Sequence, residues 1–229
     1  MKLKQINFFI IIAANLFTAN LLFSAAAEIS TTTPAVAVDT ATVDFILAQM
    51  EHAESGVKDI QFDLFQEINI GLTGEKISLT AVVYCQRPDK IKIEYNTPRK
   101  QTVTALGQKI YLSIPGSDEI IQTDWRAWNN LGFFPKEFIN PSPQTKKLRK
   151  RYNISLLSYT DGYYQLLLTV PKTPEIKVTL WISSRSWFPE RVLITGKSFS
   201  ANTKITSLRL NQNLREEIFK VDTKKNAGL

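Results

Sequence analysis

The chain has 229 residues, of which 44% are hydrophobic and 21% are charged, and its formal net charge is +7. This length and composition are ordinary for one folded domain with a sizeable core. The single cysteine, Cys85, excludes an internal disulfide, a zinc cluster and an iron–sulfur site, and the single histidine, His52, excludes a His-dependent triad.

Residues 1–27 have the features of a signal peptide. Lys2 and Lys4 precede an apolar stretch at 8–23, and three alanines at 25–27 supply the small residues that a signal peptidase needs. A transmembrane anchor is the alternative, which the two asparagines in the apolar stretch disfavour. We expect cleavage near Ala27, which removes two lysines and no acidic residue and lowers the charge from +7 to +5. With no cysteine there for lipidation, we expect a soluble periplasmic protein.

A Thr-, Ala- and Pro-rich lead at 28–38 predicts a disordered segment before a single domain at 39–229. A helix is expected from Asp39 or Thr40 to Gly56, because apolar residues recur there at helical spacing. Alternating runs after it predict a mainly β (α+β) fold with one strongly curved antiparallel sheet. The strands are expected at 60–70, 77–85, 90–95, 101–106, 109–114, 152–158, 163–170, 176–182, 191–195, 203–211 and 218–221.

The segment 125–138 interrupts the strand pattern with a dense group of tryptophans and phenylalanines. Gly132 and Pro135 divide it, so two short helices are expected, and with the first helix they make about three helical pieces against one sheet. Periodicity alone leaves two alternatives open. The concave side of the sheet either is a filled core or lines a cavity.

The order of these features resembles the LolA family, periplasmic carriers that move lipoproteins toward the outer membrane. The resemblance spans nearly the whole mature chain. It includes Arg87-Pro88 at a strand end, a Thr97-Pro98 turn, a hairpin around Gly107 and Phe65-Gln66 in a strand similar to the family's F-x-Q strand. The Trp/Phe-rich segment, the hairpin "YNISLLS…YYQLLLTVP" and the closing "SLRLNQNLREEIFKVD" follow in the family's order.

The resemblance implies an incomplete antiparallel β-barrel with a helical lid over an apolar cavity. It also implies three partners: lipoprotein acyl chains, an inner-membrane lipoprotein-releasing ABC transporter and an outer-membrane acceptor. We expect the acyl chains to contact Ile60, Phe62, Leu64, Ile91, Ile93 and Tyr95 on the sheet and Trp125, Trp128, Phe134 and Phe138 on the lid. The alternative is a module of the same fold that binds or senses a glycolipid or fatty acid.

Arg87 ends an alternating run, and Pro88 favours an extended backbone that holds its direction. Its guanidinium has five donors, for which the free carbonyls of a lid helix are suitable acceptors. In the LolA family the matching arginine latches the lid, so the resemblance implies the same role here. A solvated strand-end arginine is the alternative.

The run "KKLRKR" holds five cations within six residues: Lys146, Lys147, Arg149, Lys150 and Arg151. We expect it on an exposed connection, where it is either solvated or contacts an anionic membrane surface or an acidic partner. An exported chain rarely meets nucleic acid, so no nucleic-acid partner is expected. Cys85 is expected to be a buried small hydrophobe rather than a reactive thiol.

The sequence contains no hydrolase, zinc-protease, phosphate-loop or calcium-loop motif. The neighbouring acids Glu216 and Glu217 would point to opposite faces of a strand, so they do not form a carboxylate pair. We therefore expect a monomeric binding protein without catalytic residues, metal or cofactor.

Overall fold

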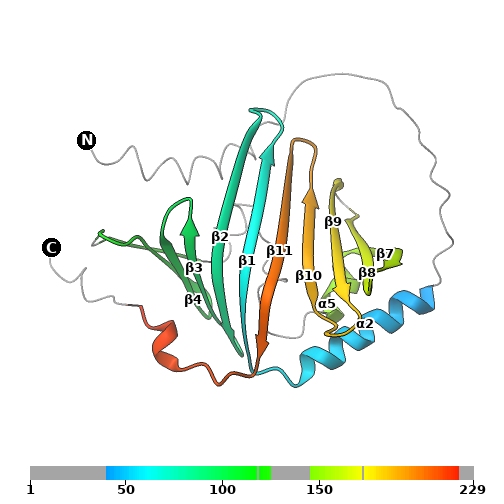
Figure 1. Cartoon of the computed structure of the whole chain (residues 1–229), viewed down its shortest axis with the longest axis horizontal. Coiled ribbons are helices and arrows are strands. Elements are labelled where there is room, and N and C mark those ends of the chain that lie inside the picture. Colours follow the sequence, from blue (N-terminus) through cyan, green and yellow to red (C-terminus); the bar gives the residue numbers. More distant parts are fainter. Residues whose placement is uncertain (1–39, 118, 125–144, 172, 222–229) are drawn as a thin grey trace.

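Eleven antiparallel strands form one open sheet in the computed structural model, which describes residues 40–117, 119–124, 145–171 and 173–221 (Figure 1). The strand order is β6-β5-β4-β3-β2-β1-β11-β10-β9-β8-β7, so β6 and β7 are the edges. The strands are β1 Asp59–Ile70, β2 Glu75–Gln86, β3 Lys90–Thr97, β4 Gln101–Leu106, β5 Lys109–Ser113, β6 Ile120–Asp124, β7 Asn153–Thr160, β8 Tyr163–Val170, β9 Thr173–Ser183, β10 Pro189–Thr195 and β11 Phe199–Leu210.

The pairing register places the apolar residues of neighbouring strands on one face. Directly opposed residues share a face, so the pairs Ile60↔Cys85 and Phe62↔Val83 continue the apolar side of β1 into β2. The pair Leu64↔Ile205 continues it into β11. The register between β1 and β11 shifts near Gln61, an irregularity that adds local twist and bending.

Helix α2 (Thr40–Ser55) crosses the β7–β10 half of the sheet (Figure 1). Its apolar residues recur every three or four positions, which puts them on the side that faces the sheet. The short helix α5 (Thr145–Arg151) packs beside it. Together they bury one cluster, here called the helix-covered core, whose main helical members are Val43, Ile46, Leu47, Met50 and Leu148 and whose strand members include Leu166, Leu180 and Val192.

A second cluster, here called the apolar face, lies on β1–β5 and β11. Its buried members are Phe62, Ala81, Val83, Cys85, Ile91, Ile93, Val103, Ala105, Ile110 and Ile205, with Ile60, Leu64, Tyr95, Leu112 and Leu208 packed against them. A buried polar pair interrupts the apolar side of β1. Gln66 Nε2 donates to Thr203 Oγ1 over 2.8 Å, between Leu64 of the apolar face and Ile68 of the helix-covered core.

The predicted mainly β architecture and antiparallel sheet are confirmed, and the helix expected from residue 39 or 40 to 56 is α2. An incomplete barrel was expected; over the described residues the sheet is open, with β6 and β7 as its edge strands. The strand expected at 218–221 is wrong, because Glu216–Phe219 forms a 3-10 helix, η1, that buries Phe219. Strand β6 was not predicted.

The predicted lid of about three helices is not confirmed. Two α-helices, α2 and α5, lie in the described ranges, and the helical pieces expected at 125–138 fall outside them. Neither described helix is long and apolar enough to cross a membrane.

Candidate functional site

The six sheet residues predicted to contact acyl chains lie together on the apolar face. Phe62, Ile91 and Ile93 are buried members, and Ile60, Leu64 and Tyr95 pack against them. The four predicted lid residues, Trp125, Trp128, Phe134 and Phe138, lie outside the described residues. The period of two that identified the six residues also runs through β2 and β4, and it could have identified the remaining members of the face.

Small side chains occupy the middle of the apolar face. Ala81 stands opposite Leu64 and Tyr95, and Ala105 stands opposite Ile91 and Ile110. Small residues beside large ones let the surface follow the curvature of the sheet. Val83 and Ala105 are each 1% exposed, whereas Ile60, Leu64 and Tyr95, which pack against the cluster, are only partly buried.

Two ionisable groups on the apolar face stay neutral. Burial raises the pKa of the Cys85 thiol, and it raises the pKa of the Tyr95 hydroxyl to about 12. Cys85 is buried, as the sequence predicts, in an environment that disfavours the reactive thiolate. The apolar face therefore carries no charge from these residues near neutral pH.

Arg87 lies where β2 ends, at the C-terminal end of α2. Its guanidinium donates from Nη2 to the carbonyl oxygen of Glu54 and from Nη1 to that of Ser55, the second over 3.4 Å. These are last-turn carbonyls, which lack partners within the helix. The backbone amide of Arg87 also donates to Lys58 O over 2.9 Å, so main chain and side chain both bind the α2–β1 connection. The helix that Arg87 contacts is the one that covers the helix-covered core.

A buried carboxylate organises the same corner. Asp59, 2% exposed, accepts from the backbone amides of Gln212 and Leu214 at 2.7 and 3.3 Å. Gln86 Nε2 donates to Leu214 O over 2.9 Å, while its buried Oε1 has no hydrogen-bond partner among the described residues. Asp59 thus joins the start of β1 to the segment that follows β11, next to Arg87.

The basic run is a helix rather than a connection. Residues 145–151 form α5, in which Leu148, together with Tyr152 just beyond the helix, is buried in the helix-covered core. Arg149, Lys150 and Arg151 are exposed, as expected. The side chains of Lys146 and Lys147 lie outside the described ones.

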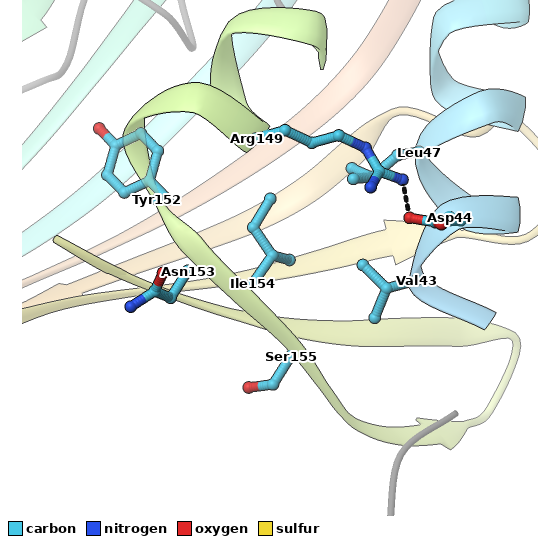
Figure 2. A pocket seen from close by; sticks show the side chains of 8 residues that line it. All are labelled: Val43, Asp44, Leu47, Arg149, Tyr152, Asn153, Ile154 and Ser155. Carbon is cyan, nitrogen blue, oxygen red and sulfur yellow. Dashed lines mark ion pairs between the residues drawn. The ribbon is translucent and has the colours of Figure 1, made fainter. Parts of the chain in front are cut away.

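A pocket of about 340 Å³ lies between α2, α5 and the start of β7 (Figure 2). Val43, Leu47 and Ile154 form its apolar part. At its rim Arg149 of α5 makes an ion pair with Asp44 of α2, marked by the dashed line in Figure 2. This volume is within the range of small-ligand sites. Sequence reasoning missed the pocket because its walls come from two segments, 43–47 and 149–155, that lie about a hundred residues apart.

Comparisons with known proteins place the fold. No protein-family model matches the sequence, and neither does any curated protein sequence. A LolA superfamily protein from Nitrosomonas europaea aligns with 14% identity over 78% of this chain and 97% of that one, with a TM-score of 0.45.

Two solved structures give a TM-score of 0.52, each at 12% identity. One is an uncharacterized conserved protein from Thermus thermophilus, aligned over 79% of this chain and 93% of that one. The other is MucB, aligned over 80% of this chain and 64% of that one, so the chain spans less than two thirds of MucB. Identities this low show the fold and nothing further. The chain shares the fold of these two solved structures.

Proposed function

We propose that this protein is a periplasmic carrier that binds the acyl chains of lipoproteins and moves them from the inner to the outer membrane. The observation that carries the proposal is the apolar face, a continuous uncharged surface on one side of β1–β5 and β11. The expected signal peptide supports the periplasmic location. The lipoprotein-releasing ABC transporter and the outer-membrane acceptor follow from the LolA resemblance.

The energetics require a surface of this kind. Each methylene moved from water into an apolar environment contributes about 0.8 kcal/mol, so three acyl chains represent tens of kcal/mol. The buried members of the apolar face, such as Val83 and Ala105, become accessible to a cargo only when the structure rearranges. Arg87 adds hydrogen bonds at the C-terminal end of α2, a helix that also packs on the helix-covered core. Hydrogen bonds that can break and re-form suit a carrier that must load and release. Binding and release involve no chemical step.

The test is binding of a triacylated peptide, with the unacylated peptide as the ligand control, by calorimetry on the purified mature protein. Adjacent residues of β1 offer a matched pair of variants. Leu64 belongs to the apolar face, whereas Phe65 is 37% exposed on the opposite face. We expect Leu64→Ser to weaken binding of the acylated peptide about tenfold and Phe65→Ser to leave it unchanged. Equal binding of acylated and unacylated peptides contradicts the proposal.

The pocket between α2, α5 and β7 supports a second candidate, a module for one small acidic amphiphile such as a fatty acid. Its volume suits a single ligand, its walls are partly apolar, and Arg149 could exchange Asp44 for a ligand carboxylate. Mass spectrometry of lipids extracted from the purified protein separates the candidates. Recovery of an acylated protein supports the carrier, and recovery of a free fatty acid or glycolipid supports the module.

A further inference from the structure

Four aromatic rings, from α2, the β9–β10 turn, β8 and β7, form a continuous row. Phe45 of α2 packs edge-on against Trp187, with ring centroids 5.8 Å apart and an interplanar angle of 85°. Trp187 stacks on Tyr164 of β8 at 5.6 Å and 15°, and Tyr164 contacts Tyr159 of β7 at 4.5 Å. This set of Phe45, Trp187, Tyr164 and Tyr159 is called the aromatic row below.

The row is fixed at its middle and exposed at its ends. Trp187 and Tyr164 pack against the helix-covered core, whereas Phe45 is 50% exposed and Tyr159 is 56% exposed. Both ends of the row therefore present large aromatic side chains to solvent. They form a surface that can be covered.

The backbone at Trp187 supports a role for its side chain. Trp187 lies in the β9–β10 turn, in contact with Phe45 of α2, with a left-handed φ of 60° that favours glycine over a bulky residue. Two backbone–backbone hydrogen bonds hold this turn: Trp187 N donates to Ser183 O over 2.8 Å, and Ser183 N donates to Phe188 O over 3.1 Å. A tryptophan at such a position bridges Phe45 and Tyr164, which glycine could not do.

The charges around the row favour an anionic surface. Arg185 is exposed in the same turn, and the exposed cations Lys150 and Arg151 lie on α5, beside α2. Of the neighbouring acids, Asp44 is paired with Arg149, and Glu190 accepts from the hydroxyls of Tyr163 and Ser186. Asp161 is exposed at the β7–β8 turn, and its negative charge reduces the positive charge around the row.

We propose that the aromatic row inserts into the headgroup region of a bilayer that contains anionic lipids. Tyr and Trp are amphipathic rings that favour this region, and flanking Arg and Lys side chains contact lipid phosphates. The row is separate from the apolar face proposed to hold acyl chains. Vesicle binding tests the row and acylated-peptide binding tests the face, so the two proposals fail independently.

The experiment is sedimentation of the mature protein with vesicles of phosphatidylcholine containing about a third phosphatidylglycerol, and with vesicles of phosphatidylcholine alone. We expect Phe45→Ser/Tyr159→Ser to lower the partition coefficient on anionic vesicles about tenfold or more, because two exposed rings lose their insertion. Phe65→Ser is the matched control, because it removes an exposed ring that lies on β1, outside the aromatic row. It should bind vesicles like the parent. The variants' thermal unfolding checks that the fold persists.

A second measurement reports insertion directly. Quenching of tryptophan fluorescence by brominated lipids should be present in the parent and reduced in Trp187→Tyr, because Trp187 lies in the row. Unchanged partitioning of the double variant, equal loss in Phe65→Ser, or equal parent binding to vesicles without anionic lipid would each overturn the proposal. Binding of a soluble oligosaccharide by a protein that ignores vesicles would assign the row to sugar stacking and overturn it as well.

Discussion

Replacing Arg87 by leucine tests the proposed latch. In the structure its guanidinium donates to Glu54 O and Ser55 O at the end of α2. A hydrogen bond from a charged donor contributes about 1.5–3 kcal/mol. The Ser55 contact is exposed and 3.4 Å long, so most of this contribution comes from Glu54. We therefore expect the latch to contribute about 2–3 kcal/mol, which shifts an equilibrium between closed and open forms roughly 30- to 150-fold.

The fold should survive the substitution, because the sheet register and the helix-covered core do not depend on the Arg87 side chain. Arg87→Leu should retain bound acylated peptide but pass it to acceptor vesicles more slowly, since re-forming the latch no longer assists release. Hydrogen exchange of the amides near the end of α2 should become faster by a factor of the same order as the 30- to 150-fold shift in the closed–open equilibrium. Circular dichroism should match that of the parent.

Two variants serve as controls. Arg99 is an exposed arginine on the connection between β3 and β4, so Arg99→Leu removes the same charge at a different site. It should transfer cargo like the parent. Arg87→Lys keeps the charge but loses the planar fork and should fall between the parent and the leucine variant. Transfer by Arg87→Leu at the parental rate, with unchanged exchange at α2, would show that Arg87 is not a latch.

Three further predictions concern the apolar face and α5. Ile93→Ala should lower the free energy of unfolding by about 2–5 kcal/mol in a urea titration, because Ile93 is 6% exposed; a loss below 1 kcal/mol would show that the face is loosely packed. Tyr95 has its pKa raised to about 12, so between pH 10 and 12 the unfolded chain loses this proton while the folded chain keeps it, and stability should fall with rising pH by about 2–3 kcal/mol. Tyr95→Phe should lose about that much less stability over the same pH range. An identical pH profile of stability in both proteins would show that the Tyr95 hydroxyl is not the cause. Lys150→Glu/Arg151→Glu should slow cargo loading at low salt, with the difference shrinking as salt rises; an unchanged rate at low salt means that these cations are only solvated.

Much of the architecture could be predicted because alternation is a local signal. Successive side chains of a strand point to opposite faces, so Ile60, Phe62 and Leu64 could be assigned to one side of β1 without knowledge of their neighbours. Helical spacing gave α2 in the same way. The basic run was predicted to be an exposed connection because five of its six residues are cations. Its one apolar residue, Leu148, stabilises a helix only by packing into the helix-covered core, and the sequence does not show that contact.

The location of Arg87 at a strand end followed from the sequence, but its acceptors did not. Glu54 and Ser55 lie more than 30 residues earlier, and only the return of β2 to the start of β1 brings them within hydrogen-bond distance. Asp59 and its amide donors in 212–214 come together for the same reason.

The sequence by itself determined the strand periodicity, the apolar side of each strand and the types of side chain available. Only the tertiary structure decided which strands are neighbours, that the sheet stays open, and that Phe45, Trp187, Tyr164 and Tyr159 form one row. The physical reason is the distance along the chain over which each effect acts. Backbone geometry and side-chain alternation act over a few residues, whereas strand pairing and ring contacts join segments whose separation along the chain carries no periodic signal.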